Sequence, residues 1–143
     1  MKVKIINVSN NLLPTYATIG SAGMDLVSDN FNPITIDPNE RVLVMTGNYI
    51  ELPDGYEAQI RSRSGLVFKK GLVVANAPGT IDCDYRGEIG VIIHNISNQQ
   101  QHIAPGERIA QMIVAKYERV EWEEVDSFSN TERGTGGFGS TGV

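Results

Sequence analysis

The stretch Asn76-Ala-Pro-Gly-Thr-Ile-Asp-Cys-Asp-Tyr-Arg-Gly87 contains a Pro-Gly turn, two carboxylates two residues apart and an aromatic ring. Pro78-Gly79 interrupts any regular element and favours a turn. If the residues that follow are extended, Asp82 and Asp84 share one face and Tyr85 points to the other. A second turn signal and an apolar run come next. The stretch therefore predicts a β-hairpin that carries a carboxylate and an aromatic ring near its tip.

Short β-rich segments alternate with turn signals through the rest of the chain. The expected strands are residues 2–8, 24–27, 31–36, 41–45, 48–52, 56–61, 72–75, 88–96, 108–116 and 120–125. Short strands with turn signals about every eight to twelve residues are typical of an all-β barrel or sandwich. One short helix is expected near 64–70, with Ser64 as its N-cap and Gly71 just past its end.

The composition narrows the class of protein. The 143 residues fit one domain with a real core, and 12 Lys and Arg against 17 Asp and Glu give a net charge of −5. This balance argues against a general binder of nucleic acid or of an anionic membrane, although a local arginine cluster can still bind one phosphorylated ligand. The single cysteine, Cys83, fits a reducing compartment. Without a membrane-length apolar run or a signal-peptide pattern, we expect a soluble, cytoplasmic protein.

The last fifteen residues differ in character from the rest. Residues 129–143 contain five glycines and little apolar surface, so they cannot hold themselves folded. We therefore expect a β-barrel domain over residues 1–128 and a flexible, glycine-rich C-terminal arm over 129–143. Phe138, which lies between two glycines in this arm, needs a ligand or a partner on which to pack.

Several segments could bind phosphate: Arg63-Ser64-Gly65, Gln111, Arg133 and residues 139–142. Glycine lets a backbone N–H approach an oxyanion closely, and arginine forms bidentate, charge-assisted bonds to phosphate. Each segment also has an ordinary alternative. Ser64 could simply cap a helix, Arg63 could be a solvated surface charge, Gln111 could lie on the polar face of a strand, and a glycine-rich end is commonly disordered.

Other residue types exclude some classes of site. A lone aspartate such as Asp25, Asp82 or Asp84 is commonly a turn or capping acceptor, and this alternative stays open for each. His94 and His102 lack metal-ligand spacing with any Cys or His, so a zinc site is not expected. The chain has no P-loop motif and no Gly-x-Gly-x-x-Gly opening a helix, which argues against a P-loop or Rossmann nucleotide binder.

Taken together, these segments resemble the five ordered motifs of the trimeric dUTP pyrophosphatases (deoxyuridine 5′-triphosphate nucleotidohydrolases). The corresponding segments are residues 22–26, 63–66, 79–87, 108–113 and 133–142. They occur in the family's order and span nearly the whole chain. The departures are small: Ser62 stands where proline is common, Val67 where alanine is common, and Thr80 where an aliphatic residue is usual.

The resemblance implies a fold, an assembly and a reaction. The fold would be the family's distorted jelly-roll barrel (β-clip), assembled as a homotrimer. Each of three shared active sites would take the hairpin from one subunit, a phosphate cradle from the next and the arm from the third. With Mg²⁺ as cofactor, the enzyme would hydrolyse dUTP to dUMP and pyrophosphate, which keeps dUTP out of DNA and supplies dUMP for dTMP synthesis.

The resemblance also implies roles for residues of the hairpin. Asp82 would orient and deprotonate the attacking water and contact the sugar 3′-OH. Tyr85 would pack under the deoxyribose and leave no room for a 2′-OH. A hairpin backbone that mimics a base-pairing edge can select uracil, because a wrong base leaves buried groups unpaired. The implied uracil-binding residues are Asn76, Gly79, Thr80, Ile81, Asp82 and Gly90.

For the triphosphate, the resemblance implies a cradle and a closing arm. The cradle residues are Arg63, Ser64, Gly65 and Gln111. Asp25 would contact Mg²⁺ through water, since this ion dehydrates reluctantly. In the arm, Phe138 would stack over uracil and Arg133 would contact the γ-phosphate. Gly139, Ser140 and Thr141 would add phosphate contacts, and closure of the arm would exclude water and align the nucleophile.

Two other functions compete with this interpretation. A dCTP deaminase on the same fold needs a glutamate beside C4 of the base, and the hairpin offers no convincing candidate. A regulator that uses dUTP to switch its contact with a partner would bind the nucleotide but barely turn it over. The intact Asp82 and the intact arm both argue against such a loss of catalysis.

Overall fold

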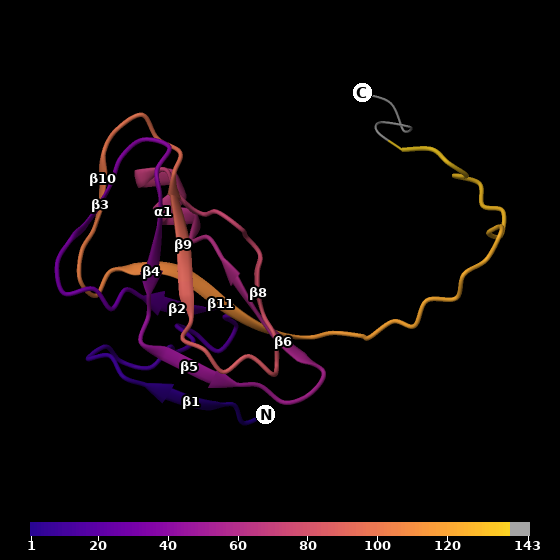
Figure 1. Ribbon diagram of the computed structural model, residues 1–143, viewed down its shortest axis with the longest axis horizontal. Helices are drawn as coiled ribbons and strands as arrows, with labels where there is room; N and C mark the ends of the chain where they lie inside the picture. The colour runs from indigo at the N-terminus through magenta and orange to yellow at the C-terminus, as the bar shows by residue number, and fades with distance from the viewer. Residues whose placement is uncertain (138–143) are drawn as a thin grey trace.

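Eleven strands and one short helix form the described part of the chain, residues 1–137, in a computed structural model (Figure 1). Their bounds are β1 Lys4–Asn7, β2 Met24–Val27, β3 Ile34–Ile36, β4 Arg41–Met45, β5 Asn48–Glu51, β6 Tyr56–Arg61, α1 Ser64–Lys70, β7 Leu72–Val74, β8 Gly79–Ile81, β9 Gly90–Asn95, β10 Gln101–Ile103 and β11 Arg108–Lys116. The prediction of an all-β fold with one short helix is confirmed.

The strands pair into two larger and two smaller antiparallel sheets. One sheet has the order β2-β11-β6-β8 and the other the order β4-β9-β7, while β1 pairs with β5 and β3 pairs with β10. Strand β9 shows why these sheets enclose a core, since Val91, Ile93 and Asn95 are buried while the residues between them are more exposed. A two-residue period of this kind turns one face of a strand inward. Leu26 and Ile109 are buried in the same core cluster.

The two paired strands of the predicted hairpin are confirmed, but the predicted conformation of its tip is wrong. β7 and β9 pair antiparallel, with Leu72 opposite Asn95. Between them, however, β8 leaves this sheet and pairs with β6, placing Gly79 opposite Ile60. The residues after β8 form a turn rather than an extended segment, because the Tyr85 N–H donates to the Asp82 carbonyl at 3.2 Å. The expectation that Asp82 and Asp84 share one face of an extended segment is therefore wrong.

Helix α1 begins one residue earlier than the predicted cap implied. Arg63 is the N-cap, with extended backbone angles and no side-chain capping bond, and Ser64 is the first helical residue. The prediction of Ser64 as N-cap is thus wrong. The predicted end is confirmed: Gly71 has a left-handed φ of 64° and its N–H donates to the Val67 carbonyl at 2.9 Å. Glycine adopts this conformation without a Cβ penalty.

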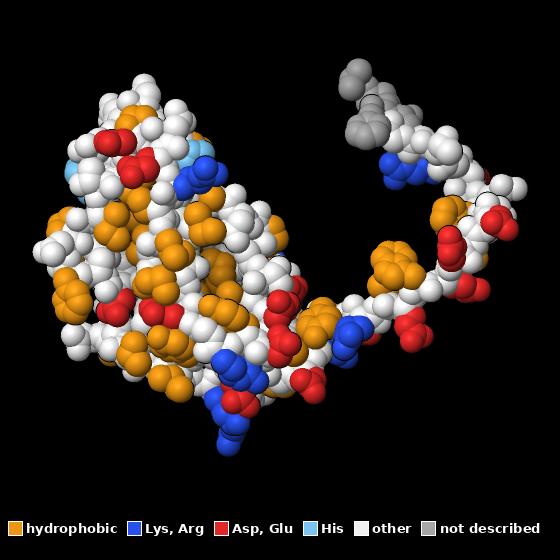
Figure 2. Space-filling view, viewed as in Figure 1, with side chains coloured by type: hydrophobic (Ala, Val, Ile, Leu, Met, Phe, Trp, Pro, Cys, Tyr) orange, Lys and Arg blue, Asp and Glu red, His pale blue; other side chains and the backbone are white. Residues whose placement is uncertain are grey.

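The segment after β11 runs out from the barrel in an extended course that continues into the predicted arm (Figure 1). The expected strand at 120–125 is wrong, because these residues pair with no other strand in the described part of the chain. Val120, Trp122 and Phe128 are exposed, Trp122 by 93%, and the space-filling view shows large apolar side chains exposed along the extended segment after the barrel (Figure 2). Alternation alone does not make a strand, since a strand also needs an edge with which to pair. Within residues 1–137, no helix is long and apolar enough to cross a membrane.

Candidate active site

Two arginines converge on the carboxylate of Asp25. Strand β11 pairs with β2 on one side and β6 on the other, which places Gln111 opposite both Asp25 and Arg61. Arg63, at the start of α1, donates from Nε to Asp25 Oδ1 at 2.8 Å, and Arg108 Nη1 donates to Asp25 Oδ2 at 3.3 Å. We call Asp25, Arg63, Arg108 and Gln111 the cradle. Sequence reasoning missed the Arg108 contact, although Arg108 opens a matching motif.

The cradle arginines keep capacity for another anion. The Asp25 and Arg63 side chains are 35% and 25% exposed, so both reach solvent. Arg63 also donates from Nη1 to the Arg108 main-chain carbonyl at 3.3 Å. A guanidinium has five N–H donors in a fixed fork, and the described contacts use three of those of Arg63. The remaining donors can bind phosphate oxygens.

Gln111 is held in the cradle by its neighbours. Its Nε2 donates to the Ser62 main-chain carbonyl at 2.9 Å. A Cβ at Gly23 would lie only 2.7 Å from Gln111 Oε1, so this position needs glycine for the amide to stay where it is. The Ser62 hydroxyl accepts the Val74 N–H at 2.9 Å and so ties the preceding loop to β7. Gly23 is a second residue that sequence reasoning left without a role.

Ser64 and Gly65 lie exposed beside Arg63 at the beginning of α1. The first N–H groups of a helix lack intrahelical acceptors and face outward from its start. A Cβ on Gly65 would meet no described atom within 4 Å, so packing within residues 1–137 does not require glycine here. An external group that approaches the backbone closely would explain a glycine at this position.

A second group of predicted residues lies in and around β8, which is an edge strand of its sheet. Gly79 is buried, and a Cβ there would lie 3.1 Å from Asn76 Nδ2, so the two residues are in close contact. Thr80 pairs with Gln59 of β6, and Ile81 follows in the same strand. Asp82 is exposed and its carboxylate makes no hydrogen bond or ion pair with any other described residue. It is therefore available to a ligand or a water.

Tyr85 lies folded back over the loop that leads to β9. Its hydroxyl donates to the Glu88 main-chain carbonyl at 3.0 Å, and 44% of the residue is exposed. A Cβ on Gly87 would overlap the Tyr85 hydroxyl and ring. Gly90 has a packing reason of its own, because a Cβ there would lie 2.8 Å from Leu43 Cδ1 on β4. The structure thus explains Gly90 by sheet packing, without a ligand.

The arm stands away from both groups. Arg133 donates from Nε to the Gly136 carbonyl at 2.8 Å and has no hydrogen bond or ion pair to the barrel among residues 1–137. The predicted site residues Phe138, Gly139, Ser140 and Thr141 lie outside the described residues. No hydrogen bond joins the cradle to the hairpin residues within residues 1–137 either. One chain therefore presents the predicted residues as separate groups.

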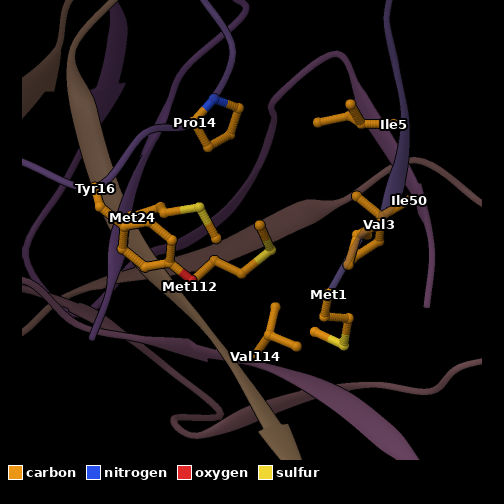
Figure 3. Close-up of a pocket in the computed structure, with 9 residues that line it drawn as sticks. All are labelled: Met1, Val3, Ile5, Pro14, Tyr16, Met24, Ile50, Met112 and Val114. Carbon is orange, nitrogen blue, oxygen red and sulfur yellow. The ribbon is translucent and has the colours of Figure 1, made fainter. Parts of the chain in front are cut away.

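Two hollows on the surface of the barrel differ in the polarity of the residues that line them. The hollow in Figure 3, of about 240 Å³, is lined by apolar and aromatic side chains: Met1, Val3, Ile5, Pro14, Tyr16, Met24, Ile50, Met112 and Val114. These side chains offer no charged partner for a triphosphate. A more polar hollow of about 370 Å³ is bordered by Asp25 and Arg108 and so adjoins the cradle.

The structure is thus that of an all-β barrel protein in which two arginines are grouped around one aspartate. A family model described as dUTPase matches residues 9–142, and the chain belongs to the dUTPase family. The sequence resemblance is therefore confirmed. A deoxyuridine 5′-triphosphate nucleotidohydrolase of Finegoldia magna is 56% identical over 142 residues, covering 99% of each chain. One of Rickettsia felis is 57% identical and covers 100% of this chain and 97% of its own.

Solved structures agree with this family and fold. The dUTPase of Staphylococcus bacteriophage 80alpha, solved with dUPNHPP, is 27% identical, covers 99% of each chain and superimposes with a TM-score of 0.90. A G164S mutant of the same phage protein, with the same kind of ligand, gives a TM-score of 0.89. The predicted dUTPase-like barrel is confirmed.

Proposed function

We propose that this chain hydrolyses dUTP to dUMP and pyrophosphate. Membership of the dUTPase family supports the reaction, as do relatives that are named nucleotidohydrolases of this substrate. The observation that carries the proposal is the pairing of Arg63 and Arg108 around Asp25, beside Gln111, on a barrel whose separate loop offers the exposed carboxylate of Asp82. The reaction would keep dUTP out of DNA and supply dUMP for dTMP synthesis.

The cradle would bind the phosphates of the substrate. The unused N–H donors of Arg63, the exposed backbone at Ser64 and Gly65, and the amide of Gln111 all suit anionic oxygens. Because Asp25 already orients the two guanidinium groups, little reorganisation is needed when phosphate arrives. Binding in this geometry would fix the α-phosphorus relative to the nucleophile.

Asp82 would act as the general base. Its exposure and lack of partners in residues 1–137 suit a group that must accept a proton from a water held between it and the substrate. The water oxygen would form a bond to the α-phosphorus while the bond to the bridging oxygen of pyrophosphate breaks. The water proton would pass to the carboxylate, and pyrophosphate would leave with the electron pair.

The hairpin would select the nucleoside. Asn76 packs against Gly79, and the backbone from Gly79 through Thr80 and Ile81 to Asp82 would read the uracil edge, with Gly90 nearby on the return strand. The Tyr85 ring, folded over its loop, would lie under the deoxyribose and exclude a 2′-OH. Discrimination of this kind is effective where a wrong group leaves buried donors or acceptors unpaired.

Mg²⁺ fits this site as an ion that accompanies the triphosphate. Within residues 1–137 no group of three His, Cys, Asp or Glu could hold a metal, and the oxygens of Asp25 already accept bonds from two arginines. Asp25 would therefore contact the ion through water, while the phosphates provide most of its ligands, which suits the strong hydration of Mg²⁺. The bound ion would neutralise charge on the triphosphate.

A homotrimer with shared active sites would bring the separate groups together. The exposed apolar side chains between β11 and the arm, which are Val120, Trp122 and Phe128, and the apolar hollow of Figure 3 both support burial against other copies of the chain. The arm, which we assign to 129–143 beyond a barrel domain of 1–128, would then supply Arg133, Phe138, Gly139, Ser140 and Thr141 to a neighbour's site. The free thiol of Cys83 supports a reducing, cytoplasmic location.

Pyrophosphate release from dUTP, dCTP, dTTP and UTP, each with and without Mg²⁺, tests the proposal. Of the four nucleotides, we expect only dUTP to release pyrophosphate rapidly. We expect this rate to fall markedly when Mg²⁺ is chelated. Deamination of dCTP would favour the deaminase on the same fold. Tight dUTP binding with negligible turnover would favour the regulator and contradict the proposed reaction.

A further inference from the structure

The hydroxyl of Tyr85 is anchored to the backbone of Glu88, a residue to which the proposed reaction assigns no role. Tyr85 donates to the Glu88 carbonyl oxygen at 3.0 Å. The Glu88 carboxylate in turn accepts the Gly47 N–H at 2.7 Å and the Tyr49 hydroxyl at 3.3 Å. Glu88 therefore connects the proposed sugar-binding ring to the turn between β4 and β5.

The turn between β4 and β5 is also hydrogen-bonded to the residue that follows Glu88. The Ile89 N–H donates to the Asn48 carbonyl at 2.8 Å, and the Thr46 hydroxyl donates to the Ile89 carbonyl at 2.8 Å. Thr46 and Asn48 are buried. The chain is thus bonded to the turn through Glu88 and through the next residue, both of which lie directly before β9.

Close packing leaves little room for the anchored backbone to shift. Gly47 has a φ of 68°, and a Cβ there would lie 2.6 Å from Ser9 Cβ, so its N–H is held in one direction by a tightly packed turn. On the hairpin side, Gly87 has no space for a Cβ beneath the Tyr85 ring. Burial, followed by the Glu88 charge, raises the pKa of Tyr49, so the phenol stays protonated as a donor to the carboxylate.

We propose that Glu88 is a positioning residue that holds the Tyr85 ring at the deoxyribose and thereby sets the discrimination between dUTP and UTP. This inference rests on the proposed function of Tyr85. Without the carboxylate, the Gly47 N–H and the Tyr49 hydroxyl lose their acceptor, and the segment that carries the Glu88 carbonyl is tied down only through Ile89. The ring then gains freedom to move aside, and a 2′-OH gains space.

Steady-state kinetics on dUTP and UTP with Glu88→Ala and Glu88→Gln tests the proposal, at temperatures well below the Tm of each variant. A glutamine can still accept the Gly47 N–H, so we expect Glu88→Gln to keep the selectivity. We expect Glu88→Ala to lower the ratio of kcat/KM for dUTP over UTP by about tenfold to a hundredfold, as small misplacements near a reacting group do. The matched control is Glu40→Ala, which removes a carboxylate that accepts the Asp37 N–H at 2.7 Å in another turn.

A double-mutant cycle separates positioning from a general structural role. If Glu88 acts through the ring, Glu88→Ala has no further effect on the selectivity ratio in a Tyr85→Ala background. An unchanged ratio in the single variant, or an equal drop in both backgrounds, overturns the proposal. Should Glu88→Ala fail to fold, Tyr85→Phe removes only the anchoring hydroxyl, and an unchanged ratio there overturns it equally. A wild-type protein without dUTP turnover contradicts the proposed function instead.

Discussion

Asp25 and Arg63 form an ion pair of 2.8 Å across 38 positions of sequence, joining β2 to the residue that precedes α1. Arg108 completes this arrangement from β11 at 3.3 Å. The pair fixes the guanidinium of Arg63 at the edge of the sheet, with donors left over. Asp25 is thus proposed to orient the phosphate-binding arginine as well as to contact the hydrated Mg²⁺.

We predict that Asp25→Asn lowers kcat/KM for dUTP by about tenfold to a hundredfold, because both the oriented arginine and the water-mediated metal contact weaken. The fold should change little in stability, by about 1 kcal/mol or less, since the pair is partly exposed and screened. Kinetics over a Mg²⁺ titration and thermal unfolding measure the two effects. Glu51→Gln, which breaks the Lys4–Glu51 pair, is the matched control and should leave the kinetics unchanged. Equal kinetics in the two variants would contradict the assignment.

Asp82→Asn should abolish turnover while affinity for a non-hydrolysable dUTP analogue stays within about tenfold, because the proposed base is lost and the cradle remains. Calorimetric titration and product analysis give the two values. Asp84→Asn is the control, since Asp84 is an exposed carboxylate in the same turn to which no role is assigned. Near-normal rates in Asp82→Asn would refute the role of this carboxylate.

Tyr85→Ala should admit UTP, because the ring that is proposed to exclude a 2′-OH is gone. The measurement is kcat/KM for UTP and for dUTP, compared with the wild-type protein. Unchanged discrimination against the ribonucleotide would remove this role from Tyr85.

Deletion of residues 129–143 should leave a folded protein with greatly reduced turnover. Co-folding this truncated chain with Asp82→Asn should then restore activity in about a quarter of the sites at equal mixing. The reason is that an active site needs the hairpin of a truncated subunit and the arm of an Asp82→Asn subunit. If the mixture stays as inactive as its parents, the shared-site assembly is wrong. Loss of folding in the truncated chain would instead make the arm structural.

The pH dependence of stability should carry a contribution from Glu51. The hydrogen bond from Lys4, followed by the charge of Lys4, holds the pKa of Glu51 below its ordinary value of 4.5. A depressed folded-state pKa contributes stability above 4.5 that is lost as the pH falls through the lower, folded value. Glu51→Gln should therefore lose less stability than the wild-type protein between about pH 5 and pH 3. If the stability of Glu51→Gln and of the wild-type protein falls equally over this pH range, Glu51 makes no such contribution.

Much of the barrel was predictable because its strands combine apolar content, alternation and turn residues. Gly71 also ends α1 as predicted, since a left-handed cap favours glycine. The three-residue strand β8 was not foreseen as a separate element, because a segment this short takes its partner from the sheet around it. Val120–Val125 shows the opposite error: a strand-like pattern forms no pairing in the described part of the chain, because pairing depends on an available edge.

Some candidate site residues could be singled out from the sequence, and their functional roles stay predictions, but their arrangement in space could not be predicted. The motifs identified Asp25, Arg63 and Gln111, since each type suits phosphate or metal chemistry. The contact of Arg108 with Asp25 depends on the register between β11 and β2, including an irregularity near residues 108–110, which no local pattern encodes. The support of Tyr85 by Glu88 likewise depends on how the β4–β5 turn packs beneath the loop.

The most direct measurement follows heavy-isotope oxygen from labelled water into the products of dUTP hydrolysis in the presence of Mg²⁺. Attack on the α-phosphorus by an Asp82-activated water predicts one labelled oxygen in dUMP and none in pyrophosphate. Label in pyrophosphate, or dUTP left intact by the wild-type protein, would contradict the proposed reaction.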